Sequence, residues 1–256
     1  MIKSIKIKKI LFRLLIFSTI IISILVFKKI FFSNKTLHFL FTEKIYIHRV
    51  NSLEKLSEIK KDYQGVELDI VFKKSINRFD VNHPPTQSIN LELVDYFKSV
   101  NKTSKLKYWL DLKHLDENNV ELSINRLNKI CDKLNKENII IESSNPKLLN
   151  RFAQDGFQTS YYLPANLIQL NKDSLEFTIS KITEHISQFK PTFISANYKD
   201  YPILNKSFPK LKKLTWVSGG RGDMNILESR LLIYKIFFDT KTEVILLPLI
   251  TKKGNR

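Results

Sequence analysis

Strand-like and helix-like segments alternate along most of this chain of 256 residues, and this alternation limits its fold more than any other feature. Short apolar, β-branched runs predict eight strands, which begin near residues 45, 66, 107, 138, 158, 192, 213 and 243. Most of these runs are separated by segments with apolar residues at helical spacing, such as residues 120–135. Repeated strand–helix units form parallel sheets, and eight of them predict a closed (β/α)8 barrel, the TIM barrel, over residues 37–256.

An open, doubly wound sheet is the alternative arrangement for such a chain. That fold usually carries a glycine-rich phosphate loop after its first strand. No such loop follows the strand predicted at residues 45–50, and the whole chain has six glycines. The sequence therefore favours the closed barrel. We interpret FDVNHPP, residues 79–85, as an excursion after the second strand rather than as a further barrel strand.

The N-terminal segment differs from the rest of the chain. Four lysines within residues 1–9 precede an apolar run of 18 residues that only Arg13 interrupts. At about 1.5 Å per residue, such a run nearly crosses a bilayer core of roughly 30 Å, so we predict a transmembrane helix over residues 10–32. No small-residue cleavage site precedes Lys28, which favours an uncleaved signal anchor over a cleaved signal peptide. Because the larger basic cluster lies before the helix, we expect a single-pass protein with residues 1–9 in the cytoplasm and the barrel outside it.

The charge of the chain is strongly positive, with 42 basic and 25 acidic side chains and a formal net charge of +17. This excess suggests an anionic partner, such as a phosphorylated substrate, an anionic lipid surface or nucleic acid. A lysine- and asparagine-rich coding bias is the alternative explanation. No zinc-finger or helix-turn-helix pattern is present, so we expect no nucleic-acid partner. The single cysteine, Cys131, excludes an intrachain disulfide and is predicted to be a buried apolar residue.

Three acidic side chains lie on neighbouring predicted strands. Glu67 and Asp69 are two residues apart on the second strand and therefore share one of its faces, and Asp111 lies on the third strand. Chemistry in a barrel takes place at the C-terminal ends of the strands, and acids gathered there repel one another unless a cation lies between them. Carboxylate oxygens suit a hard divalent cation, so we predict a Mg²⁺ or Ca²⁺ site from these three residues. The alternative is a solvated face or local pairing with lysine.

Basic side chains and histidines flank these acids. His48 and Arg49 end the first strand, Lys113 lies two residues after Asp111, and His83 precedes two prolines that stiffen its loop. Imidazole suits proton transfer near neutral pH, whereas arginine and lysine suit a bound anion. Each group also has an ordinary structural explanation, because single histidines are usually structural and Lys113 could form a local ion pair.

Taken in order, these motifs resemble the phospholipase-C-like phosphodiesterase superfamily, which includes the glycerophosphodiester phosphodiesterases and the spider-venom phospholipase D enzymes. The similarity is closest to the menorin-like branch and extends over residues 45–250. The motifs that carry it are HRVNS, VELD, NHPP followed by NLELVDYF, WLDLK and a late TWV.

The resemblance implies a metal-dependent phosphodiesterase that acts on a glycerophosphodiester or a phospholipid headgroup by two-histidine acid–base catalysis. By position, it implies catalytic roles for His48 and His83, divalent-metal ligation by Glu67, Asp69 and Asp111, phosphate contacts from Arg49 and Lys113, and a place near the substrate for Trp216.

Two positions depart from the glycerophosphodiesterases. Asp111 stands where those enzymes usually carry glutamate, and Pro84 follows the loop histidine where they carry an acid. The alternative function is a non-catalytic, menorin-like barrel that binds a phosphorylated ligand or a partner protein. The sequence leaves open hydrolysis against cyclic phosphate formation, the identity of the cation and the oligomeric state.

Overall fold

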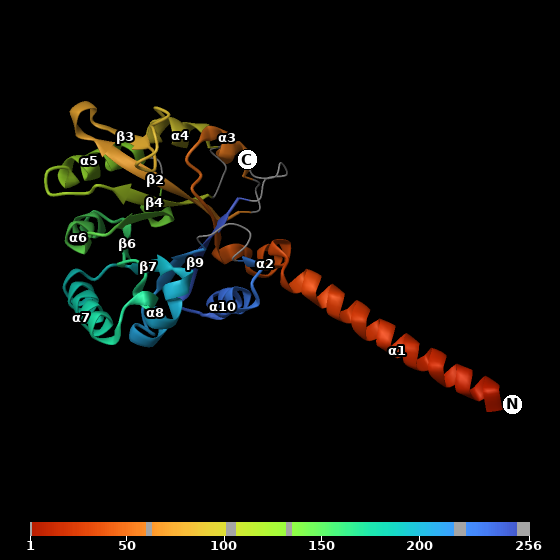
Figure 1. Ribbon diagram of the computed structural model, residues 1–256. Coiled ribbons are helices and arrows are strands. Elements are labelled where there is room, and N and C mark those ends of the chain that lie inside the picture. Colours follow the sequence, from red (N-terminus) through yellow and green to blue (C-terminus); the bar gives the residue numbers. More distant parts are fainter. Residues whose placement is uncertain (1, 60–62, 101–105, 132–134, 218–223, 250–256) are drawn as a thin grey trace.

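The computed structural model describes residues 2–59, 63–100, 106–131, 135–217 and 224–249, with side chains from residue 11 onward (Figure 1). It contains a closed barrel of eight parallel strands, as the alternation of segments predicts. The strands of the barrel are β1 (Ile45–His48), β2 (Gly65–Lys73), β4 (Lys107–Lys113), β5 (Ile139–Ser143), β6 (Gln158–Tyr162), β7 (Phe193–Asn197), β8 (Lys213–Trp216) and β9 (Thr242–Pro248).

Closure of the barrel depends on β1, which pairs in parallel with β9 on one side and with β2 on the other. Tight packing at this seam requires Gly65, because a Cβ atom there would lie 2.5 Å from the ring of Tyr46. Inside the barrel, side chains including Tyr46, Trp109, Phe193 and Leu246 form an apolar cluster beneath the strand ends.

The helices lie outside the strands, as Figure 1 shows, and all but the N-terminal one cover the barrel. They are α1 (Ile2–Phe31), α2 (Asn34–Phe41), α3 (Leu53–Glu58), α4 (Leu93–Ser99), α5 (Val120–Cys131), α6 (Pro146–Gln154), α7 (Lys172–Phe189), α8 (Tyr201–Ser207) and α10 (Leu227–Phe238). Short 3-10 turns occur at η1 (Thr42–Lys44), η2 (Lys74–Ile76), η3 (Lys136–Asn138), η4 (Leu167–Gln169) and η5 (Tyr198–Asp200). Cys131 is buried at the end of α5, as predicted.

The excursion after the second strand lies outside the barrel, as predicted, and it includes a short strand. Part of the excursion after the second strand forms β3 (Arg78–Val81), which pairs antiparallel with the far end of β2. The hairpin extends β2 beyond the barrel, so β3 adds a strand to the sheet without entering the closed ring. The hairpin carries His83 back towards the mouth of the barrel, because Asn82 donates its backbone N–H to the Asp69 carbonyl at 3.0 Å.

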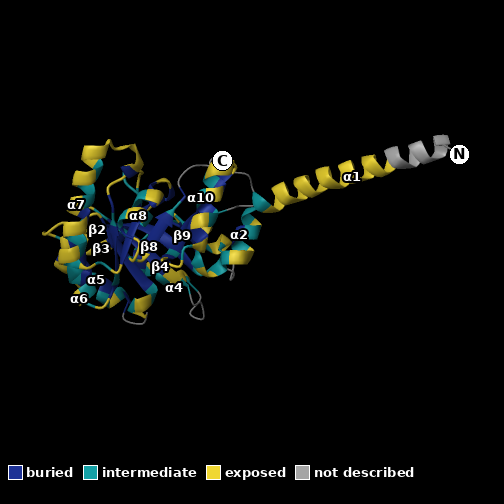
Figure 2. Ribbon diagram, turned by 90° about the horizontal axis from the view of Figure 1, so that it is seen from below, coloured by how far each residue is buried: buried dark blue, intermediate teal, exposed yellow. Residues whose placement is uncertain are grey.

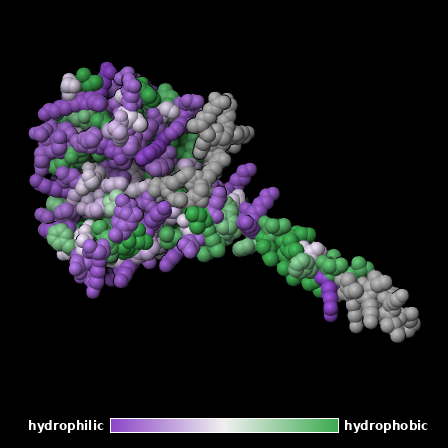
Figure 3. All heavy atoms as spheres, viewed as in Figure 1, coloured by the Kyte–Doolittle hydropathy of each residue, from purple (hydrophilic) through white to green (hydrophobic). Residues whose placement is uncertain are grey.

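The N-terminal helix α1 projects away from the barrel and is exposed from Leu11 to Ile30 (Figure 2). Residues Leu11–Phe31 have a mean hydropathy of 2.3, which makes α1 a candidate membrane span, as the sequence predicts. Figure 3 shows this helix as an apolar rod joined to a mostly hydrophilic barrel. The hydroxyls of Ser18 and Thr19 donate to the Leu15 carbonyl at 2.8 and 2.5 Å, so neither remains unpaired within the apolar run.

Candidate active site

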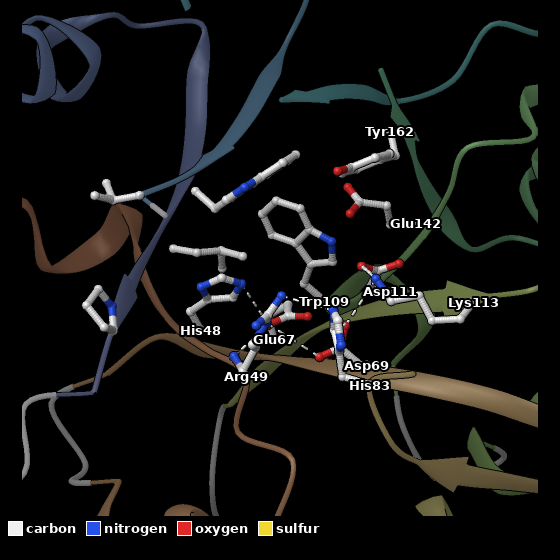
Figure 4. A pocket seen from close by; sticks show the side chains of 14 residues that line it. His48, Arg49, Glu67, Asp69, His83, Trp109, Asp111, Lys113, Glu142 and Tyr162 are labelled. Atoms are coloured by element: carbon white, nitrogen blue, oxygen red, sulfur yellow. Dashed lines mark hydrogen bonds and ion pairs between the residues drawn. The ribbon is translucent and has the colours of Figure 1, made fainter. Parts of the chain in front are cut away.

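A cavity of about 280 Å³ opens at the C-terminal ends of the strands, and all eight predicted site residues line it (Figure 4). The residues that line it are His48, Arg49, Glu67, Asp69, His83, Trp109, Asp111, Lys113, Glu142, Tyr162, Trp216, Val217, Leu246 and Pro248. The structure therefore brings together residues from distant parts of the sequence, while their chemical roles stay predictions.

The three carboxylates Glu67, Asp69 and Asp111 converge on one point of the cavity. Asp69 and Asp111 are direct neighbours in the parallel pairing of β2 with β4, and Glu67 lies on the same face two residues earlier. One oxygen from each group lies within 4.8 Å of the others. Burial, with the negative charges of Asp69 and Asp111, raises the pKa of Glu67 well above its usual value. Burial also raises the pKa of Asp111.

Lys113 offsets part of this negative charge. Its Nζ lies 3.1 Å from Asp69 Oδ1 and forms a second, shorter ion pair with Asp111. Burial opposes the charge of the ammonium group, but Asp111 and Asp69 outweigh that effect and raise the pKa of Lys113. Arg49 Nε also lies 4.0 Å from Asp69 Oδ2, so two positive groups flank two buried acids and the part-buried Asp111. The oxygen-only donor set suits a hard divalent cation. The residues present therefore fit such an ion.

His48 lies beside the acids without a direct hydrogen bond to them, its Nε2 being 3.7 Å from Glu67 Oε2. Burial lowers the pKa of His48 to about 4, and the nearby charge of Arg49 adds to the effect. The imidazole is consequently neutral at neutral pH and can accept a proton.

Arg49 connects the first strand to the loop histidine. Its backbone N–H donates to Glu67 Oε2 at 2.6 Å, and its Nη2 lies 2.9 Å from His83 Nε2. Since a guanidinium group can only donate, His83 Nε2 is the acceptor and the ring proton is on Nδ1. The same His83 Nε2 lies 3.9 Å from Asp69 Oδ1. At this distance the Asp69 carboxylate can stabilise a positive charge on the ring.

Asn51, the last polar residue of the HRVN sequence, was not among the predicted site residues. Its side chain donates to Asp69 Oδ2 at 2.7 Å and accepts the backbone N–H of Asp69 at 2.9 Å. This pair of hydrogen bonds fixes the carboxylate from the side opposite Lys113. The available signal was the position of Asn51 within the HRVNS motif, three residues after His48.

Glu142 is a second residue that the sequence analysis missed. It lies opposite Asp111 in the pairing of β4 with β5, is 2% exposed, and accepts hydrogen bonds from Ser160 and Ser195. Burial raises the pKa of Glu142 well above normal, and the charge of Asp111 adds to the shift. The only signal was a single acid within the apolar run IIIES.

Aromatic side chains form the opposite wall of the cavity. Trp216 stacks on Tyr162 with ring centroids 5.1 Å apart and an interplanar angle of 12°. Trp109 is fully buried, and its Nε1 has no hydrogen-bond partner among the residues that the structure describes. In Figure 4 the indole lies between the acids and the Tyr162 side of the cavity. The site therefore combines a charged half with an aromatic half.

Comparison with known proteins identifies the fold. No protein-family model matches the chain, and no curated protein matches it in sequence. Among solved structures, a glycerophosphodiester phosphodiesterase from Parabacteroides distasonis is 16% identical with a TM-score of 0.55, covering 80% of this chain and 92% of that one. The corresponding enzyme from Thermotoga maritima is 16% identical with a TM-score of 0.54, covering 79% and 92%. Orotidine 5'-monophosphate decarboxylase from Sulfolobus solfataricus is 12% identical with a TM-score of 0.50, covering 83% and 91%. At these identities the similarity establishes the barrel, which this chain shares with glycerophosphodiester phosphodiesterases.

Proposed function

We propose that this chain is a membrane-anchored phosphodiesterase that works with a divalent cation, Mg²⁺ or Ca²⁺. The observation that carries the proposal is the convergence of two histidines and three carboxylates on one cavity at the mouth of the barrel. The shared fold of glycerophosphodiester phosphodiesterases supports the same reaction class.

Glu67, Asp69 and Asp111 would hold the cation, which would supply positive charge to the nonbridging oxygens of a phosphodiester. Lys113 and Arg49 would contact the same phosphate, because both are cations that face the cavity. Charge builds on those oxygens during attack at phosphorus, so groups already fixed in place stabilise the transition state more than the ground state. Trp216 would lie against the organic part of the substrate.

His48 would accept the proton of the attacking hydroxyl. Burial and the charge of Arg49 lower its pKa, so the ring is neutral and has a nitrogen free to take that proton. The new oxygen–phosphorus bond forms as the bond to the leaving oxygen breaks. His83, after Nε2 has taken up a proton from solvent, would give that proton to the leaving oxygen. For this, Arg49 must release His83 Nε2 and turn to the phosphate, and Asp69 would then stabilise the protonated ring. The attacking hydroxyl belongs either to water or to the substrate, where it would yield a cyclic phosphate.

The membrane part of the proposal concerns α1 and the sides of the membrane on which its two ends lie. We infer that residues 10–32 anchor the chain, that residues 1–9 lie in the cytoplasm and that residues 37–256 form the barrel outside it. Residues Leu11–Phe31 would extend about 31 Å as a helix, close to the roughly 30 Å of a bilayer core. A diester close to a membrane, such as a phospholipid headgroup or a glycerophosphodiester, is then the substrate class within reach.

The test uses the full chain in detergent with bis-p-nitrophenyl phosphate, glycerophosphocholine and a short-chain phospholipid. Turnover is expected only with added Mg²⁺ or Ca²⁺, and EDTA should abolish it. His48→Ala and His83→Ala should each remove activity without changing the thermal unfolding temperature by more than a few degrees. Turnover that persists in EDTA and in both variants would refute the proposal.

One observation favours a second candidate function, a barrel that binds a phosphorylated ligand without turnover. Lys113 forms ion pairs with Asp69 and Asp111, and Arg49 hydrogen-bonds to His83. These contacts within the site already pair part of its acids and bases with one another. Such a barrel would give a cation- or ligand-dependent thermal shift with no product from any of the three substrates.

A further inference from the structure

The end of α1 is fastened to the barrel by a fully buried arginine on α10, Arg230. Its Nε donates to the Phe31 carbonyl at 2.8 Å, its Nη2 to the Ser33 carbonyl at 2.7 Å, and its Nη1 to Asn34 Oδ1 at 2.9 Å. Tyr234, one turn later, donates to the Phe31 carbonyl at 3.1 Å and stacks on the Phe31 ring. The Phe31 carbonyl at the end of α1 thus gains two side-chain donors, and the Ser33 carbonyl, which also accepts the Leu37 N–H, gains one. The helix therefore leaves the barrel at a defined place beside α10.

Exposed apolar side chains surround this place. On α10, Leu227, Leu231 and Phe238 occupy one stripe of the helix and are 56%, 53% and 70% exposed. On α2, Phe39 is 86% exposed and Leu40 is 54% exposed. We call these five residues the docking face. Removing apolar side chains of this size from water is favourable, so the face favours an apolar partner.

The position of the docking face indicates which partner covers it. Figures 1 and 2 both show α2 and α10 at the base of α1, whereas α7 lies on the far side of the barrel. Lys28 and Lys29 stand in the last turn of α1, and Lys35 follows in the first turn of α2. Basic side chains next to exposed aromatic and aliphatic groups match the boundary between phospholipid headgroups and acyl chains.

We propose that the docking face lies in the surface of the bilayer that α1 crosses, with anionic phospholipid as its partner. This inference rests on the proposed membrane anchoring and adds to it a fixed orientation of the barrel. Lys28, Lys29 and Lys35 lie between the apolar run of α1 and the docking face, and the Arg230 contacts hold the end of α1 beside α10. The barrel is thus held against the membrane by one side.

Spin labels on the full chain test this orientation. The only native cysteine, Cys131, is 2% exposed, so an introduced cysteine is the main site of labelling. Leu231→Cys and Phe238→Cys place labels on the docking face, and Phe177→Cys on α7 is the matched control, being 66% exposed against 70% for Phe238. Ile22→Cys reports the depth of α1. The proteins are reconstituted in vesicles of phosphatidylcholine with phosphatidylglycerol, and collisions with oxygen and with a water-soluble nickel complex are measured.

Labels at 231 and 238 should collide with nickel on the order of ten-fold less than the label at 177, as expected for groups below the headgroups. If the label at 22 lies in the bilayer while those at 231 and 238 match the one at 177, the docking face is refuted and the anchor stands. A label at 22 that is open to nickel overturns both the anchor and the docking inference. Unfolding temperatures of all four variants identify any that fail to fold, and Phe39→Cys then replaces an affected docking-face variant.

Discussion

Arg49 has a backbone φ of 54°, in the left-handed region that side chains disfavour. Its backbone N–H faces Glu67 in this conformation, which joins the end of β1 to the acid cluster. A glycine would adopt the same φ without strain but would lack the guanidinium group that contacts His83. The backbone strain thus occurs at a residue whose side chain has a role in the proposed reaction.

Arg49→Gly should separate these two effects. We expect its free energy of unfolding to stay within about 1 kcal/mol of the parent, because relief of strain offsets the added entropy of the unfolded chain. Phosphodiester turnover should fall at least about ten-fold through lost phosphate contacts. Urea unfolding and turnover measured on the same preparation check both expectations. A large loss of stability with normal turnover would show that Arg49 is only structural.

Asp111→Asn tests the cation site. The substitution keeps the size of the side chain but removes one of three converging negative charges. The midpoint for Mg²⁺ or Ca²⁺ binding, followed by calorimetry, should rise at least about ten-fold. Asp173→Asn, in the exposed first turn of α7, is the matched control and should leave the midpoint unchanged. Equal midpoints in both variants would place the cation elsewhere.

At the scale of elements, Asp239 joins α10 to the strands. Its carboxylate accepts hydrogen bonds from Tyr201 at 3.0 Å and from the Lys241 backbone at 2.8 Å, and it lies 3.6 Å from Nζ of Lys213, which is 1% exposed. Burial alone would raise the pKa of Asp239, but the hydrogen bonds from Lys241 and Tyr201 and the charge of Lys213 lower it. Removing the carboxylate would leave a buried ammonium group without its counterion.

Asp239→Asn should therefore destabilise the protein by roughly 2–4 kcal/mol at pH 7. A carboxyl group whose pKa is lowered on folding stabilises the fold above its unfolded pKa, about 3.9, and loses that contribution as the pH falls through the folded value. The gap between parent and variant should consequently shrink below about pH 4. Urea unfolding at pH 7 and pH 3 measures it, and a gap of the same size at both values would contradict the assignment.

The barrel was accessible from sequence because its strands are separate apolar runs, and β-branched residues dominate runs such as IYIHRV and NIIIESS. The weaker elements were not. The strand β3 has only four residues, and it forms because the longer β2 offers a pairing edge beyond the barrel. The helix α8 has seven residues and begins at Tyr201–Pro202, too short a run for helical periodicity to be visible. Both elements depend on tertiary contacts, which the local sequence pattern does not reveal.

The candidate site shows the same division. Glu67, Asp69 and Asp111 were predictable because alternation along a strand places them on one face. Glu142 was not, since the hydroxyls that make its burial tolerable come from Ser160 and Ser195, which lie 18 and 53 residues later on two other strands. The hydrogen bonds of Asn51 to Asp69 likewise become visible only when β1 and β2 are adjacent.

On the scale of the whole molecule, the candidate membrane helix and the candidate site lie towards one end of the barrel. The cavity opens where the strands end, and α10 begins after the end of β8, so Arg230 in its first turns holds α1 towards the mouth. Under the proposed anchoring, the cavity would meet diesters at the membrane surface. Whether that surface would be the outer one depends on the direction in which α1 would cross.

The distribution of basic residues predicts that direction. Four lysines precede the apolar run within residues 1–9, and fewer basic residues follow closely after it, so the positive-inside rule predicts a cytoplasmic N-terminus. In intact bacterial cells that express the full chain, a membrane-impermeant maleimide should label Phe177→Cys, whose position is exposed on α7. Ser4→Cys should be labelled only after the cells are opened. Because both variants share the buried Cys131, the parent chain is the background control. The reverse pattern would place the barrel, and with it the proposed substrate, on the cytoplasmic side.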